Sequence, residues 1–370
     1  MIKKYRSYSG FSRFHTCNRR ELHSRHRKQY PPMYEMPSGL VGKVVHAVIK
    51  TMHDDPTLIL ENQVALEFDM QEVMLDVPVD YGKAGRDFYT GKAQRCAKWY
   101  WHWNKDIDIR SSERWFYVPV RMPDGTDEWI RGRFDQIINV DGQLVIRELK
   151  TGQVNKDTKK SLEFDLQCLI QAYALKYGYI VTSDEPYIPI DDPAYHIHDW
   201  KLFDSRDDGP DLYKCASPGC KLTAEQFGTY PAKIIWYHIP SCEPPANCLK
   251  WTKLTAVSNP PADAEYETRT VEMKTKTKEE RYWRVPMQMR ADPEWIIDAP
   301  NENQVKHLLG KLVISIMQIG TCEESGIWEQ TLNNSGYQSP CPNCMTRQHC
   351  ESLKCCTVKH EEIEEDVDDK

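Results

Sequence analysis

The sequence lacks any run of about 18 consecutive apolar residues, a length that a membrane-spanning helix needs. Its basic N-terminus is not followed by an apolar stretch, and the chain contains no internal repeat. We therefore expect neither a membrane span nor a secretory signal, and we predict a cytoplasmic location. With 370 residues, 40% of them hydrophobic and 28% charged, the composition is that of a globular protein with two domains or one enlarged domain.

An excess of positive charge is also missing. The formal net charge is −7, which by itself argues against binding to nucleic acid. The charge is unevenly distributed, however: residues 1–30 carry nine Lys or Arg and one acid, whereas the last ten residues carry seven acids and one Lys. We expect the acidic tail to be disordered. The body that remains is close to neutral, and its basic N-terminal arm either holds phosphates or is a mobile terminus without a partner.

The chain can be divided into elements by its apolar periodicity. The spacing of apolar residues predicts helices over residues 9–25, 38–55, 83–104, 161–178 and 301–320. It predicts strands over residues 115–151, 179–185 and 232–239. Between about 185 and 300, Pro, Asp, Thr and Lys dominate, which indicates an elaborated insertion.

The segment FDQIINVDGQLVIRELKTG, residues 134–152, predicts a β-hairpin. Asp141 and Gly142 are typical of a tight two-residue turn, because this dipeptide readily adopts the positive φ angles that the turn requires. If these two residues form the loop, Val140 pairs with Gln143. The turn therefore fixes the register of both strands.

That register brings unfavourable charges together. It places Asp135 directly across from Glu148, with Cβ atoms about 4.5–5.5 Å apart. Lys150 lies on the same face as Glu148, and Ile137 and Ile146 make this face partly apolar. Two acids in such a place are destabilising unless a cation compensates them. A divalent metal between the carboxylates, with the lysine beside it, would resolve the conflict; the alternative is a solvated hairpin with charges on its outer face.

A lone Asp followed by Glu-x-Lys on the next strand resembles the PD-(D/E)XK nuclease superfamily. Two further patterns resemble its RecB-like branch: Gly42 is followed four residues later by His46 on an apolar helix, and Asp135 follows Gly132 by three residues. A lone histidine on such a helix can also be an ordinary core residue. The resemblance implies a restriction-endonuclease-like α/β fold, in which helices flank a mixed central sheet.

The resemblance also assigns roles to the hairpin residues. It implies that Asp135 and Glu148, with the backbone carbonyl of Leu149 and with His46, hold one or two Mg²⁺ or Mn²⁺ ions, for which oxygen ligands are suited. Lys150 would position the attacking water or stabilise the developing negative charge. The predicted reaction is metal-dependent hydrolysis of a phosphodiester bond.

The helix that follows the lysine strand contains DLQCLIQAY. RecB-like enzymes have a Q-x-x-x-Y pattern here, but the residue four before Tyr173 is Leu169, so the spacing differs. We carry the glutamine role, which is to orient Lys150 or the phosphate backbone, to Gln167. Gln171 can also be a polar position of an ordinary core helix, and Tyr173 is a possible DNA contact.

Thirteen cysteines could indicate a disulfide scaffold, but a chain of 370 residues can form a core without one, and clustered cysteines in an intracellular protein are typical of metal ligands. The segment CPNCMTRQHC supplies Cys341, Cys344 and Cys350, and a tetrahedral set needs a fourth ligand. With Cys17 upstream, this order resembles the iron–sulfur RecB-like nucleases, the group that includes AddB and the CRISPR-associated adaptation nuclease. The resemblance implies a structural [4Fe–4S] cluster; zinc in place of the cluster, and Cys96 in place of Cys17, are the alternatives.

Two further cysteine pairs lie in the insertion: Cys215 with Cys220, and Cys242 with Cys248. Together they are a candidate structural zinc site. Their spacings are wider than those of a usual zinc ribbon, so four unrelated free thiols are an equal alternative.

The resemblance implies DNA as the partner, either a single strand or an end. Arg13, Arg19 and Arg20 lie near Cys17 and are candidates for guiding the strand. A helicase, a recombinase or a single-strand-binding protein would be a further partner. Our leading hypothesis is an exonuclease of recombination, repair or replication in a bacterial or phage-infected cell. The alternatives are a non-catalytic DNA-binding or assembly subunit and a zinc-stabilised interaction protein.

The predicted domain organisation follows from these patterns. The expected parts are a basic segment carrying the first cluster cysteine (1–34), the nuclease core (35–184), an insertion that zinc could stabilise (185–300), a C-terminal helix with the iron–sulfur segment (301–358) and a disordered acidic tail (359–370).

Overall fold

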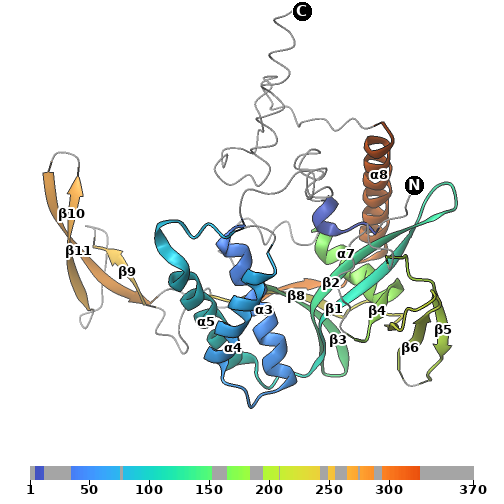
Figure 1. Ribbon diagram of the computed structural model, residues 1–370, viewed down its shortest axis with the longest axis horizontal. Helices are drawn as coiled ribbons and strands as arrows, with labels where there is room; N and C mark the ends of the chain where they lie inside the picture. The colour runs from blue at the N-terminus through green and yellow to red at the C-terminus, as the bar shows by residue number, and fades with distance from the viewer. Residues whose placement is uncertain are drawn as a thin grey trace, which may run out of the picture.

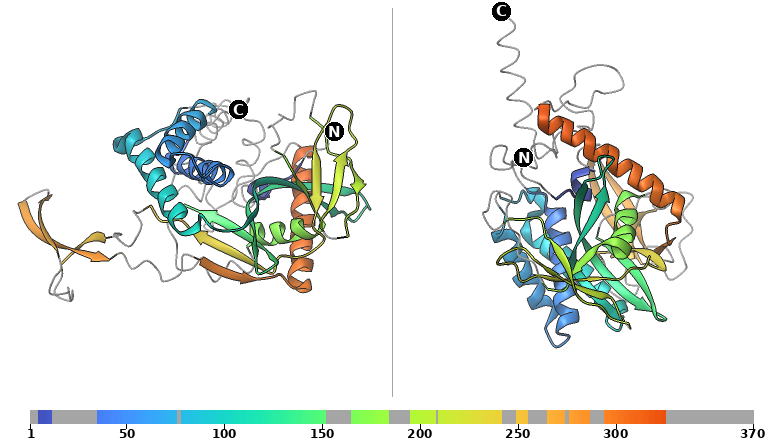
Figure 2. Two further views of the ribbon diagram at one scale, coloured as in Figure 1. Left: turned by 90° about the horizontal axis from the view of Figure 1, so that it is seen from below. Right: turned by 90° about the vertical axis from the view of Figure 1, so that its right-hand side faces the viewer.

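The computed structural model describes residues 5–11, 35–75, 78–151, 165–183, 195–207, 209–241, 249–254, 265–273, 276–286 and 294–325. Within these residues the fold is a mixed β-sheet flanked by helices on both faces (Figures 1 and 2). The predicted fold class is therefore confirmed. None of the helices in this described part of the chain combines the length and the apolar character that crossing a membrane requires.

A nine-stranded sheet forms the centre of the molecule, in the order β12-β8-β3-β2-β1-β4-β7-β6-β5. Its strands are β1 (Ile109–Arg121), β2 (Asp127–Val140), β3 (Gln143–Lys150), β4 (Tyr179–Val181), β5 (Trp200–Asp204), β6 (Asp211–Cys215), β7 (Thr223–Gln226), β8 (Lys233–His238) and β12 (Glu294–Asp298). Only β3 and β8 pair in parallel among these nine strands. The segment expected to be an insertion thus contributes five strands to the central sheet.

The predicted hairpin is confirmed as the join between β2 and β3. Val140 pairs with Gln143, and Asp141 and Gly142 have φ angles of 52° and 79°, as a tight turn of this kind requires. The ladder continues to the pair formed by Gln136 and Arg147. The sequence pattern therefore gave the correct register, and the ladder ends one pair before the two acids.

Helices cover the two faces of the sheet in separate groups. They are α3 (Pro37–Asp54), α4 (Leu60–Val73), α5 (Gly85–Asn104) after a 3₁₀ turn (Gly82–Ala84), α7 (Leu166–Tyr177) and α8 (Glu302–Ser325). One hydrophobic core lies between the sheet and α3, α4 and α5, and another lies between the sheet and α7 and α8. Figure 2 shows the blue and cyan helices on one side of the strands, with green α7 and orange α8 on the other.

The sequence did not predict α4. Its buried apolar residues are Leu60, Val64 and Phe68, which form a narrow stripe, while Leu66 and Met70 are exposed. Apolar residues on both sides of a helix weaken its periodic pattern. The expected helix over residues 9–25 is described only at its start, where residues 8–11 are helical.

A second, smaller sheet lies apart from this body. It has the order β10-β11-β9, with β9 at Leu249–Lys253, β10 at Tyr266–Met273 and β11 at Lys276–Pro286. In Figure 1 it stands at the far left, beyond α5. It therefore contributes nothing to the group of charged residues at the end of the β2–β3 hairpin.

Candidate active site

Three acidic side chains occupy neighbouring strands of the central sheet: Glu113 on β1, Asp135 on β2 and Glu148 on β3. Asp135 is 8% exposed and Glu148 is 2% exposed, so the acid pair expected from the hairpin register is buried. The backbone N–H of Leu149 donates to Asp135 Oδ2 at 2.7 Å, which fixes this carboxylate beside β3. Burying carboxylates in this way requires compensating positive charge.

His46 supplies part of that charge from α3. Its Nδ1 atom lies 3.1 Å from Glu113 Oε1 and 3.4 Å from Asp135 Oδ1. Arg133 Nε lies 2.9 Å from Glu113 Oε2, which adds a second cation to the group. The apolar residues of α3 pack against α4, α5 and the sheet, so packing of this helix positions the imidazole over the acids. One ligand atom each from His46, Glu113 and Asp135 lies within 4.8 Å of the others.

The charges of this group are strongly coupled. Burial lowers the pKa of His46, but the carboxylates of Asp135 and Glu113 outweigh burial and raise it well above its ordinary value. Burial raises the pKa of Asp135, but His46 and Lys150 outweigh burial and lower it. In the absence of a metal, an imidazolium therefore lies between two carboxylates and provides the charge that a metal cation would provide.

Glu113 was not among the residues expected from the sequence. It adopts a φ of 53°, a conformation that residues other than glycine rarely adopt and that costs free energy. The register of β1 is irregular nearby, between Ile109 and Ser111. No spacing rule identifies this residue, because its position depends on an irregular strand and on contacts with His46 and Arg133.

Glu148 is held by donors from two elements. Lys150 Nζ, from the same strand, donates to Glu148 Oε1 at 2.5 Å, and Gln167 Nε2 donates to the same oxygen. Gln171 Nε2 donates to Glu148 Oε2 at 2.7 Å. Both glutamines lie on α7, whose first turn is capped by the Asp165 side chain accepting from Gln167 N–H. Gln171, which could have been an ordinary core position, therefore contacts the acid cluster directly.

The protonation of Glu148 reflects this crowding. Burial raises its pKa, the charge of Asp135 raises it further, and hydrogen bonds and the charge of Lys150 offset only part of the rise, so the pKa is about 7. Burial lowers the pKa of Lys150, but Glu148 and Asp135 outweigh burial and raise it. Lys150 therefore stays charged, whereas Glu148 is poised to exchange a proton near neutral pH.

Basic side chains surround the acids. A cavity of about 660 Å³ opens beside Gln167 and Gln171, and its wall includes Arg131 and Arg133. The Arg131 guanidinium lies 3.9 Å from the centre of the Trp115 ring, which fixes its direction. A second cavity of about 380 Å³ is lined by Lys43, Lys50, Glu113 and Arg133. Positively charged side chains thus line two cavities next to the acid cluster, and Arg133 contributes to both.

The remaining described candidates lie outside this group. The Tyr173 hydroxyl donates to the Pro119 carbonyl at 3.4 Å, away from the acids. Cys96 is fully buried in α5, and burial raises its pKa to about 11, which favours a neutral thiol over a ligand thiolate. Among the described residues, Cys96 is not part of any group of potential metal ligands. The cysteines that Cys96 would join lie outside the described residues, so the alternative in which Cys96 replaces Cys17 stays a prediction.

Several predicted residues cannot be placed in this way. The residues outside the described ranges are Arg13, Cys17, Arg19, Arg20, Cys242, Cys248, Cys341, Cys344 and Cys350. The iron–sulfur ligand set and the strand-guiding arginines stay predictions.

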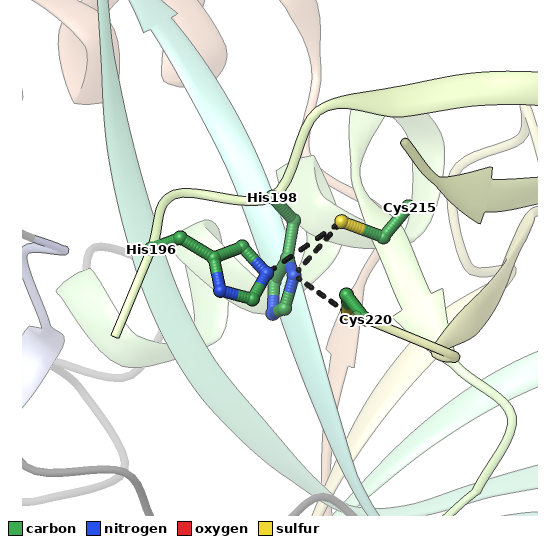
Figure 3. Close-up of side chains that lie close together, drawn as sticks. All are labelled: His196, His198, Cys215 and Cys220. Atoms are coloured by element: carbon green, nitrogen blue, oxygen red, sulfur yellow. Dashed lines mark hydrogen bonds between the residues drawn. The ribbon is translucent and has the colours of Figure 1, made fainter. Parts of the chain in front are cut away.

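Cys215 and Cys220 have described partners that were not expected. They lie together with His196 and His198 (Figure 3). Burial raises the pKa of the Cys215 thiol, but hydrogen bonds with Ser217 and the two imidazoles outweigh burial and lower it to about 6. A signal was present in the sequence: an H-x-H pair precedes the C-x₄-C pair. The four-cysteine grouping overlooked it because it paired cysteines only with cysteines.

Comparison with known proteins gives a family match that includes the acid cluster. A family model for the PD-(D/E)XK nuclease superfamily matches residues 6–206, which is more than half of the 370-residue chain. The matched range includes His46, Glu113, Asp135, Glu148 and Lys150. No curated protein matches the chain.

Proposed function

Because the chain belongs to the PD-(D/E)XK nuclease superfamily, we propose that it is a divalent-metal-dependent DNA nuclease. Members of this superfamily typically hydrolyse phosphodiester bonds with the help of divalent metals. The observation that carries the proposal is the group of three largely buried carboxylate side chains on neighbouring strands, which His46 and Lys150 contact. Such a group is costly to maintain without a function that uses it.

The donor atoms fit a hard divalent cation. Asp135 and Glu113 offer carboxylate oxygens and His46 offers an imidazole nitrogen, all within 4.8 Å of one another. Oxygen-rich sets of this kind suit Mg²⁺ or Mn²⁺. His46 must lose its proton to become a ligand, so metal binding competes with protonation of the imidazole. Glu148 and the Leu149 carbonyl would complete the site, as the hairpin motif suggests.

The residues around the site have distinct tasks in this mechanism. A bound cation would neutralise charge on the scissile phosphate and lower the pKa of an attacking water. Lys150, held by Glu148 and Gln167, supplies a fixed positive charge beside the reacting phosphate. Gln171 orients the second oxygen of Glu148. Arg131 and Arg133 bind neighbouring phosphates from the cavity wall.

We further propose that the substrate is a DNA end or a single strand, and that the enzyme is an exonuclease of recombination, repair or replication in the RecB-like branch. Support comes from the Gly42-x-x-x-His46 helix, which matches the pattern of that branch, and from Gln167, which contacts Lys150 and Glu148 although its spacing to Tyr173 differs from that pattern. A [4Fe–4S] cluster bound by Cys17, Cys341, Cys344 and Cys350 would have a structural role. A helicase, a recombinase or a single-strand-binding protein would deliver the strand.

The proposal is tested with end-labelled single-stranded and double-stranded DNA in the presence of Mg²⁺ or Mn²⁺. The wild-type protein is expected to degrade at least one substrate, and Asp135→Asn is expected to abolish degradation while DNA binding persists. Glu267→Gln is the matched control, because Glu267 is an exposed carboxylate that pairs with Arg269 on β10, outside the cluster. If the wild type leaves both labelled ends intact but binds DNA, the chain is instead the non-catalytic DNA-binding subunit.

A further inference from the structure

Four side chains with metal-binding atoms, His196, His198, Cys215 and Cys220, converge as Figure 3 shows. They lie at or next to β5 and β6, which end the strand order of the central sheet, whereas the acids lie on β1, β2 and β3. Cys215 Sγ lies 3.4 Å from His198 Nδ1 and 3.7 Å from His196 Nε2. Cys220 Sγ lies 3.7 Å from His198 Nδ1. The four ligand atoms all lie within 4.8 Å of one another. The group therefore presents two thiols and two imidazoles to a common centre.

These separations match the size of a tetrahedral zinc site. Zinc binds Cys sulfur at about 2.3 Å and His nitrogen at about 2.0–2.1 Å, so neighbouring sulfur and nitrogen ligands are separated by about 3.6 Å. The three sulfur–nitrogen distances of 3.4, 3.7 and 3.7 Å lie close to that value. Two thiolates with two imidazoles also form a common structural zinc set.

The backbone arranges the four ligands. His196 and His198 are separated by one residue, so an extended chain directs both side chains to the same side. Cys215 ends β6, and Cys220 follows a turn closed by its own N–H donating to the Ser217 carbonyl at 3.1 Å. Gly219 has a φ of 80° in this turn, a conformation that glycine adopts without strain. The two cysteines are thus brought together by local chain geometry.

A main-chain hydrogen bond joins the two ligand segments. The N–H of Ala216 donates to the carbonyl of Asp199 at 2.8 Å, and β5 pairs with β6 from Trp200 and Cys215 onward. His198 is 5% exposed and Cys215 is 3% exposed, so half of the group is withdrawn from water. The arrangement is therefore formed by paired backbone and does not depend on chance contacts between mobile side chains.

We propose that His196, His198, Cys215 and Cys220 bind a structural zinc ion at the β5–β6 end of the nine-stranded sheet. All four positions of a tetrahedral zinc would be filled by protein, which leaves no position for a water or a substrate. The site would therefore stabilise the fold and would not take part in phosphodiester hydrolysis. It shares no residue with the hard-cation centre at Asp135.

The zinc site would also fix a wall of the larger cavity. Tyr195 precedes the first ligand, and its hydroxyl accepts from the N–H of Tyr5 at 3.2 Å. The Tyr5 hydroxyl in turn accepts from the N–H of His198 at 2.6 Å. Tyr5 and Tyr195 both line the cavity of about 660 Å³ that reaches Gln167 and Gln171. Anchoring His196 and His198 thus holds two aromatic side chains at the edge of the proposed DNA-binding surface.

The test measures zinc per chain by elemental mass spectrometry, in protein produced with added zinc and purified without chelators. Cys220→Ser and His196→Gln alter the two less buried ligands and therefore disturb packing least. Each is expected to lose one zinc ion per chain relative to the wild type. Cys322→Ser, a partly exposed cysteine on α8 outside the group, is the matched control and should lose none. Zinc held elsewhere in the chain cancels in these differences.

A second measurement covers variants that fail to fold. The zinc of the wild type is exchanged for Co²⁺, and we expect the absorption bands of a tetrahedral cobalt site with thiolate ligands. Where Cys220→Ser folds, the absorbance of these bands should be lower by the amount that corresponds to one cobalt site per chain. Equal zinc content in the wild type and both ligand variants overturns the proposal. So does a Cys215–Cys220 disulfide found by mass spectrometry of the unreduced, zinc-supplied protein. Loss of nuclease activity alone, with zinc retained, bears on the proposed function and leaves the zinc site intact.

Discussion

The molecule contains two groups of potential metal ligands that differ in donor chemistry, completeness and place in the fold. The acid cluster offers mainly oxygen: Glu113, Asp135 and Glu148 lie on the central strands β1, β2 and β3, and His46 reaches them from α3. The His/Cys cluster of His196, His198, Cys215 and Cys220 offers sulfur and nitrogen and lies near the β5 end of the sheet.

The two groups are suited to different tasks. The acid cluster adjoins basic cavities and a charged lysine, so that it has charge and open space for an anionic substrate. The His/Cys cluster has enough protein ligands to close a tetrahedral site, and aromatic residues such as Tyr117 and Trp200 pack around His198. Hard ligands in an open site suit catalysis, whereas soft ligands in a closed site suit a structural role.

The largest effect is expected on the rate of DNA cleavage, when the lysine beside the acid cluster is replaced. Lys150→Met removes the fixed charge beside the acids and should lower the single-turnover cleavage rate about 10²–10³-fold, the usual consequence of losing one electrostatic donor in an active site. Lys176→Met is the control, because Lys176 lies over Tyr230 at the end of α7 and should change the rate little. If Lys150→Met cleaves DNA at the wild-type rate, Lys150 has no role in catalysis and the acid cluster loses its assignment as the active site.

A smaller effect is expected for the residue that the sequence did not reveal. Glu113→Gln removes a carboxylate from His46 and should weaken Mn²⁺ binding by roughly 10–100-fold. The pKa of His46 should fall as well, because Glu113 is one of the two carboxylates that raise it. Calorimetric titration with Mn²⁺ measures the first change, and NMR of the imidazole measures the second. If neither the Mn²⁺ affinity nor the pKa of His46 changes, Glu113 has only a structural role in β1.

Metal removal should affect the two clusters differently. A strong chelator should lower the melting temperature of the wild type by a few degrees, because a ligand that binds only the folded state stabilises it. The melting temperature of Cys220→Ser should not respond to the same treatment. Adding Mg²⁺ or Mn²⁺ should restore cleavage, and only Zn²⁺ should restore the melting temperature. Recovery of both properties with Mg²⁺ alone would contradict the division of roles.

The last expected effect concerns the pH dependence of stability. The pKa of Glu148 rises from 4.5 to about 7 on folding, so the folded state holds this proton more tightly than the unfolded state. Its contribution to stability is present below pH 4.5 and is lost as the pH rises toward about 7, by at most about 3 kcal/mol. We therefore expect the free energy of unfolding of the metal-free wild type to fall, relative to Glu148→Gln, over this range. Denaturant titrations at several pH values measure the difference, which should be constant above the range.

Part of this picture was accessible from local sequence patterns. The Asp141-Gly142 turn fixed the hairpin register because two residues with positive φ leave only one close pairing. The apolar periodicity of α3, α5, α7 and α8 predicted these helices because each has a face buried in a core. The pattern also singled out Gly132, but the reason for a glycine there lies in the fold: a Cβ would lie 2.2 Å from Phe116 Cζ, across the β1–β2 pair.

Other parts needed contacts between distant segments. Glu113 meets His46 only because α3 packs over an irregular stretch of β1. Gln171 reaches Glu148 because α7 lies against the sheet, and its spacing alone allowed an ordinary core position. His196 and His198 meet two cysteines because β5 pairs with β6. In each case the packing of separate elements selects the partner, and no spacing within one segment contains that information.

Local sequence was enough to predict the turn, the strand register, most helices and the chemical kind of each candidate ligand, because these depend on backbone preferences and on side-chain periodicity over a few residues. Which ligands meet depends on the packing of distant segments, which brings Glu113 to the acid cluster and two histidines to Cys215 and Cys220. The physical reason is that burying an acid or a thiolate is tolerated only where folding brings a compensating partner within about 4 Å, and that partner can come from anywhere in the chain.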